Sequence, residues 1–223
     1  MDSGKSVPGW HWNDYSLWLL LISNIVTIYL AVSEGWSLIA LMLVYWCQSV
    51  IIGLFTFLRI MVLKDSEILA KTPAESKAPK ILSLGQSKIF TAFFFMCHYG
   101  FFHAGYLFFI VMSAVLAGFP GVEAMGFMPA QGGIAAIARE LPMMGVAVCL
   151  FFINHLVSFA QYLKEPKMGM DLQKMMFFPY ARILPMHLTI VIGYELQGFA
   201  LPFFLALKAI ADVGMHLVEH RDG

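Results

Sequence analysis

Charged side chains are scarce in this sequence of 223 residues. Asp, Glu, Lys and Arg make up 13% of the chain and hydrophobic residues 60%, whereas about a quarter of an average soluble domain is charged. A chain of this length has too little interior to hide so much apolar surface from water, so lipid must be its solvent. The formal net charge is zero, which argues against a nucleic-acid partner.

Cysteine is also rare, and several well-known motifs are missing. Cys47, Cys97 and Cys149 all lie in apolar runs without C-x-x-C spacing, which argues against a disulfide framework or a thiolate zinc site. The sequence has no phosphate-binding loop, no G-x-S-x-G nucleophile motif, no H-E-x-x-H helix and no internal repeat. Those enzyme classes and repeat-built transporters are therefore disfavoured.

The first 18 residues, MDSGKSVPGWHWNDYSLW, lack the order of charged, apolar and small residues found in a cleaved signal peptide. Trp10, Trp12, Tyr15 and Trp18 are instead typical of an aromatic collar at a membrane interface. We therefore expect the first apolar run to be a retained helix.

Six apolar stretches are long enough to cross a hydrocarbon core of about 30 Å. The sequence thus predicts an all-α, polytopic transmembrane helix bundle that forms a single membrane domain over residues 1–223. The expected spans are residues 17–32, 37–61, 89–117, 143–162, 180–196 and 199–218, with a polar linker at 62–88.

Basic residues support this count, because cytoplasmic loops of membrane proteins are rich in Lys and Arg. If both termini are cytoplasmic, six spans place nearly all basic residues on the cytoplasmic side and only Arg139 outside, with Lys208 within the sixth span. The residues on the cytoplasmic side are Lys5, Arg59, Lys64, Lys71, Lys77, Lys80, Lys88, Lys164, Lys167, Lys174, Arg182 and Arg221.

Ionisable residues inside these spans are costly in lipid, so each calls for a partner or a function. They are His98, His103, His155, His187, Lys208, Asp212 and His216. Counted from the helix ends, His98, His155, His187 and Asp212 lie at a similar depth in the cytoplasmic half of the membrane. Lys208, Asp212 and His216 are four residues apart and share one helix face.

Three imidazoles and a carboxylate can hold a divalent transition metal. We therefore predict a metal site, with zinc favoured and copper or iron as alternatives. Its expected ligands are His98, His155, His187, Asp212 and His216. Residues expected to surround them or contact a substrate are His103, Tyr99, Asn154, Ser158, Tyr162, Arg182 and Lys208.

Two other interpretations stay open. Two of the histidines could bind a haem axially, in a redox or assembly subunit of a larger membrane complex that carries haem or copper. Alternatively, the histidines could hydrogen-bond between helices in a structural subunit without a cofactor. If the metal site is catalytic, a metal-bound water would hydrolyse a lipid-like substrate; the sequence does not decide whether the protein is an enzyme. Membrane lipid, and other membrane subunits, are the expected partners.

Four segments resemble an uncharacterised bacterial membrane family, the domain-of-unknown-function 6498 group. They are FMCHYGFFHAGYLF from Phe95, INHLVSFAQYLKEPK from Ile153, PYARILPMHLTIVIGYEL from Pro179 and LKAIADVGMHLVEHR from Leu207. The resemblance implies a multi-pass protein of the bacterial inner membrane. Because that family has no established activity, it implies no reaction.

Overall fold

The computed structural model describes residues 15–68, 84–117, 119, 133–164, 171–196, 203–208 and 210–211. These contain five α-helices and one short 3-10 helix, and no strand. The helices are α1 (Tyr15–Ser33), α2 (Leu38–Val62), η1 (Asp65–Glu67), α3 (Leu84–Leu116), α4 (Gly133–Lys164) and α5 (Leu172–Leu196). Residues 203–208 and 210–211 are also helical. The predicted all-α class is confirmed.

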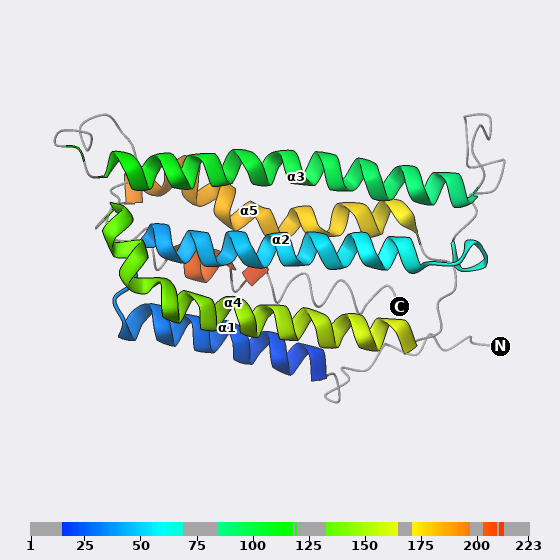
Figure 1. Cartoon of the computed structure of the whole chain (residues 1–223), viewed down its shortest axis with the longest axis horizontal. Coiled ribbons are helices and arrows are strands. Elements are labelled where there is room, and N and C mark those ends of the chain that lie inside the picture. The colour runs from blue at the N-terminus through cyan, green and yellow to red at the C-terminus, as the bar shows by residue number, and fades with distance from the viewer. Residues whose placement is uncertain are drawn as a thin grey trace, which may run out of the picture.

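The five α-helices lie roughly along one direction, and consecutive helices run in opposite senses (Figure 1). Helix α2 is central, because it contacts α3, α4 and α5, while α1 packs against α4. In the most apolar stretches of these helices, 67% of the α2 residues are buried but only 28% of those in α3 and in α4. The outer faces of α3 and α4 are therefore left for lipid.

In the described part of the chain, three helices are long and apolar enough to cross a membrane: α2, α3 over Gly85–Leu116, and α4. The Trp18–Ser33 part of α1 is a shorter apolar helix. Apolar side chains cover the exposed surface of these helices, as in Phe101 and Phe108 of α3, which are 77% and 70% exposed. The length and composition of these helices are thus consistent with a membrane protein.

Helices α4 and α5 begin eight or more residues before the predicted spans. Helix α4 starts at Gly133, ten residues before Met143, and contains Pro142. Helix α5 starts at Leu172, eight residues before the predicted span at 180–196, and neither Pro179 nor Pro185 begins it, since both lie inside. Asp171 caps it instead, because its Oδ1 accepts a hydrogen bond of 2.8 Å from the Gln173 N–H.

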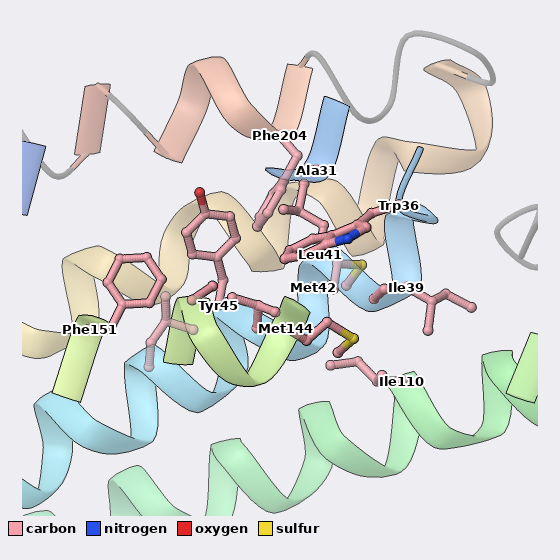
Figure 2. Packing of buried hydrophobic residues seen from close by; sticks show 14 of the residues in the cluster. Ala31, Trp36, Ile39, Leu41, Met42, Tyr45, Ile110, Met144, Phe151 and Phe204 are labelled. Carbon is pink, nitrogen blue, oxygen red and sulfur yellow. The ribbon is translucent and has the colours of Figure 1, made fainter. Parts of the chain in front are cut away.

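The apolar core surrounds the first half of α2 (Figure 2). The Tyr45 ring lies 5.9 Å from that of Phe151 in α4 and 5.3 Å from that of Phe204, measured between centroids. Phe204 belongs to the helical residues 203–208, so this segment packs directly on α2. Helix α2 is thus enclosed by α4 on one side and by the segment after α5 on another.

Polar contacts at both ends align α2 with α4. At one end, the buried Glu140 Oε2 accepts hydrogen bonds of 3.2 Å from the N–H and the hydroxyl of Ser37, the N-cap of α2. At the other end, Arg59 Nη2 donates to Ser158 Oγ at 2.7 Å, and Tyr162 Oη donates to the Arg59 carbonyl at 3.3 Å. Helices α2 and α4 therefore run in the same direction and in a defined register.

Helices α2 and α3 approach closely at Gly53. A Cβ added there would lie 2.5 Å from Cε1 of Tyr99, whose ring packs against the α2 backbone. The Tyr99 ring cannot turn away freely, because Tyr99 Oη donates a 3.0 Å hydrogen bond to the Ser49 carbonyl and lies 2.9 Å from Ser49 Oγ. Glycine is therefore required for the contact.

We predict that Gly53→Ala destabilises the protein by about 1–3 kcal/mol, because the added methyl overpacks a closely packed interface. Gly100→Ala is the matched control, since nothing lies within 4 Å of the Cβ that it adds to α3. Thermal unfolding in detergent measures both. Equal midpoints for the two variants would contradict the close approach.

Candidate functional site

The predicted site residues form two groups, one between α2 and α4 and the other between α3 and α5. Asn154, His155, Ser158 and Tyr162 belong to α4, whereas His98, Tyr99 and His103 belong to α3 and His187 to α5. Arg182 lies in α5, but its side chain is outside the described part of the structure, as are Asp212 and His216 altogether.

The α4 residues pack against α2. The buried His155 ring is stacked on Phe55 with centroids 6.4 Å apart, and Asn154 is buried as well. Ser158 and Tyr162 both contact Arg59, whose guanidinium carbon lies 5.3 Å from the Tyr162 ring centroid. This group therefore joins two helices.

Lys208 contacts the first half of α2. Its side chain is buried, and its Nζ lies 4.8 Å from the centroid of the Tyr45 ring in α2. A cation over the face of an aromatic ring is attracted by the ring quadrupole. Lys208 thus lies against α2, and its predicted neighbours Asp212 and His216 fall outside the described residues.

His98 projects from α3 towards α5. Its Nδ1 lies 2.7 Å from Tyr180 Oη, and its ring is stacked on Phe94 with centroids 5.4 Å apart and planes at 15°. The side chain is exposed at the surface of the helix pair. The tyrosine and the phenylalanine fix the orientation of the imidazole, and Nε2 has no hydrogen-bond partner among the described residues.

His187 has the same arrangement in reverse, since it projects from α5 towards α3. Its Nδ1 lies 3.2 Å from Tyr106 Oη, and the two rings meet edge to face with centroids 6.2 Å apart. The side chain of His187 is also exposed. Each of the two helices thus supplies one histidine to a tyrosine of the other.

His103 is buried between these two pairs. Its Nδ1 lies 2.8 Å from the carbonyl oxygen of Tyr99. A carbonyl can only accept, so Nδ1 carries the proton and Nε2 the lone pair. Nε2 is buried and has no hydrogen-bond partner in the described part of the chain.

Six side chains form one continuous group between α3 and α5, which we call the histidine–tyrosine cluster. The Tyr99 ring links its two halves, because its centroid is 5.4 Å from that of Tyr180 and 4.1 Å from that of His103. His103 in turn lies 6.2 Å from Tyr106. The members are His98, Tyr99, His103, Tyr106, Tyr180 and His187.

Tyr106 and Tyr180 were not among the predicted site residues. Tyr106 follows His103 by three residues, which places both on one side of a helix, so its position in the sequence was a usable signal. Tyr180 was interpreted as the beginning of a span, whereas it lies eight residues inside α5. Ser49 and Arg59 were missed for a different reason, since only the packing of α2 shows what they contact.

The structure does not bring His98, His155 and His187 into one group. Among the described residues, no three or more His, Cys, Asp or Glu side chains are placed to hold a metal ion together. Because Asp212 and His216 lie outside that part of the chain, the predicted ligand set is only partly described. The metal site stays a prediction.

These features define an all-α protein with helices long and apolar enough to cross a membrane and a cluster of polar and aromatic side chains between two of them. A family model described as a family of unknown function, DUF6498, matches residues 11–223. The chain therefore belongs to this family, as the four sequence segments predicted. Comparisons with curated proteins and with solved structures found no match.

Proposed function

We propose that this protein is a membrane-embedded binding protein whose histidine–tyrosine cluster takes up a ligand dissolved in the bilayer. The observation that carries the proposal is the exposure of His98 on the outer surface of α3 and α5. An imidazole that faces hydrocarbon without a partner for its second nitrogen is unfavourable. A ligand arriving from the lipid would supply that partner.

The arrangement of His98 and His187 favours binding over a purely structural role. In each pair the tyrosine occupies Nδ1, so the ring is held in place and Nε2 is directed elsewhere. Groups already held in their bound orientation lose less entropy when a ligand arrives. A histidine that only joined two helices would have no need of an exposed second nitrogen.

We predict that the protein, purified in mild detergent, carries a bound lipid-soluble molecule. The double variant with His98→Ala and His187→Ala should carry at least about tenfold less of this molecule, because two hydrogen bonds to it are lost. Organic extraction and mass spectrometry measure the amount per protein. Phe108→Leu, on the exposed face of α3, is the control. Equal amounts from all three proteins, or only bulk lipid from the wild type, would reject the proposal.

A second candidate function is the binding of a transition metal, and it is favoured by His103. Its Nδ1 proton is held by a backbone carbonyl, which leaves the Nε2 lone pair in the form that binds a metal. His187, on the far side of Tyr106, and the predicted Asp212 and His216 are candidate further ligands. Zinc with a bound water would support hydrolysis of a lipid-like substrate; copper, iron or a haem would support a redox role.

If this second proposal holds, elemental analysis will find about one zinc, copper or iron per chain, and His103→Ala will lose it. His155→Ala serves as the comparison, because His155 lies on the α2–α4 interface. Loss of metal from His155→Ala but not from His103→Ala would instead favour the ligand set predicted from the sequence. A metal-free wild type would exclude both.

We also propose the finer topology, with six spans, both termini in the cytoplasm and a place in the bacterial inner membrane. Support comes from the alternating directions of α1 to α5 (Figure 1). Arg59 near the end of α2, Lys88 near the start of α3 and Lys164 at the end of α4 then share one side. Lys88 Nζ also donates a 2.7 Å hydrogen bond to the Leu63 carbonyl, which joins the ends of α2 and α3.

Reporter fusions test this topology. Alkaline phosphatase is active only outside the cytoplasm, so we expect it to be inactive when fused after residue 75 and after residue 223, and active when fused after residue 125. A fluorescent protein that folds only in the cytoplasm should give the opposite pattern. Activity of alkaline phosphatase at residue 223 would contradict a cytoplasmic C-terminus.

A further inference from the structure

An aromatic ladder runs along the exposed face of α3. Four rings recur every four residues, the spacing that places side chains above one another on a helix. Phe90 stacks on Phe94 with centroids 6.1 Å apart and planes at 19°, and Phe94 stacks on His98 at 5.4 Å and 15°. Phe102 closes the ladder, edge to face, 5.1 Å from His98.

Helix α5 borders this ladder with further aromatic rings. Phe177 is 62% exposed, and its ring centroid lies 6.1 Å from that of Tyr180. Tyr180 contacts the ladder directly, since its hydroxyl pairs with His98 and the centroids of the two rings are 5.7 Å apart. The surface is therefore aromatic on both helices, with an imidazole and a phenol at its centre.

The depth of His98 restricts what can bind there. It lies 14 residues after the first residue of α3 and 18 before the last, or about 21 Å and 27 Å at 1.5 Å per residue. The hydrocarbon core is about 30 Å thick. If this core is centred on α3, His98 lies about 12 Å from one edge of it and about 18 Å from the other, away from the phospholipid headgroups. A ligand for His98 must carry its polar group into the hydrocarbon, and that group must be uncharged.

We propose that this surface binds the head ring of a lipid-soluble quinone; the inference rests on the proposed function and names the class of ligand. A quinone ring is planar, so it can stack against the aromatic ladder. Its carbonyl oxygens are uncharged acceptors that a long isoprenoid tail carries into the membrane. When Tyr180 Oη donates to His98 Nδ1, the imidazole proton resides on Nε2, which then donates to a quinone carbonyl.

The reduced form of such a ligand fits the same residues. A quinol presents hydroxyl groups, which need an acceptor. When His98 donates from Nδ1 to Tyr180 Oη, Nε2 carries the lone pair and accepts from a quinol hydroxyl. The His98–Tyr180 pair can thus hold either form by a change of tautomer, without a change of position.

The probe for this proposal is decylubiquinone, titrated into the protein in phosphatidylcholine nanodiscs, with quenching of tryptophan fluorescence as the readout. Control discs contain a lipid-soluble tryptophan analogue in place of the protein. They measure the quenching caused by quinone that is only dissolved in the bilayer. We expect saturable binding that His98→Leu weakens about tenfold, as expected for the loss of one hydrogen bond and a ring contact. His98→Gln, which keeps a donor and an acceptor, should recover part of the affinity.

Controls separate a local effect from misfolding. Phe108→Leu lies on the same helix outside the ladder and should bind as the wild type does, and each variant must keep the wild-type thermal midpoint. If His98→Leu is less stable than the wild type, only His98→Gln and Tyr180→Phe are compared. We expect Tyr180→Phe to bind decylubiquinone more weakly and to lose no more than about 1 kcal/mol of stability.

Two results would overturn the inference. One is quenching that rises linearly, as in the control discs; the other is equal affinity in the wild type and in every His98 and Tyr180 variant that folds. The extraction experiment then decides the proposed function separately. A bound molecule of another class that depends on His98 would keep the binding site and reject only the quinone.

Discussion

Lipid offers no hydrogen bonds, and this constraint determines most of the structure. Backbone groups satisfy it by forming long helices, of which α3 and α4 have 33 and 32 residues. Polar side chains satisfy it by pairing across helix interfaces. Ser37 with Glu140 and Arg59 with Ser158 align α2 and α4, and Ser49 with Tyr99 joins α2 to α3. His98 follows this rule with Nδ1, which pairs with Tyr180, but its exposed Nε2 has no hydrogen-bond partner among the described residues, and this is why it attracts a functional interpretation.

Helix α2 serves as the scaffold for the candidate site although it contributes none of the six clustered side chains. Gly53 lets the Tyr99 ring lie against its backbone, and Ser49 holds the Tyr99 hydroxyl. Trp46 Nε1 donates a 2.9 Å hydrogen bond to the His103 carbonyl one turn further along α3. Stability and site geometry therefore depend on the same contacts, so a variant at this interface must be checked for both.

The helical class and the approximate position of each helix could be predicted from apolar runs alone. Boundaries were less predictable where proline lies inside a helix. Pro142, Pro179 and Pro185 are all accommodated, because an apolar helix packed against its neighbours can tolerate the loss of a backbone hydrogen bond. The four histidines within the described spans were recognised correctly as unusual residues, yet their depth along the helices did not reveal which of them face each other.

Composition and periodicity determined by themselves that this chain is helical, that its helices are apolar enough for a membrane, and that its buried ionisable residues need partners. These properties follow from local sequence, since transfer to lipid and helix formation depend on short stretches of chain. Tertiary structure alone decided that His155 faces α2 whereas His98, His103 and His187 share an interface with three tyrosines. The physical reason is that partners far apart in sequence are set by how the helices rotate and cross, which depends on every contact in the bundle at once.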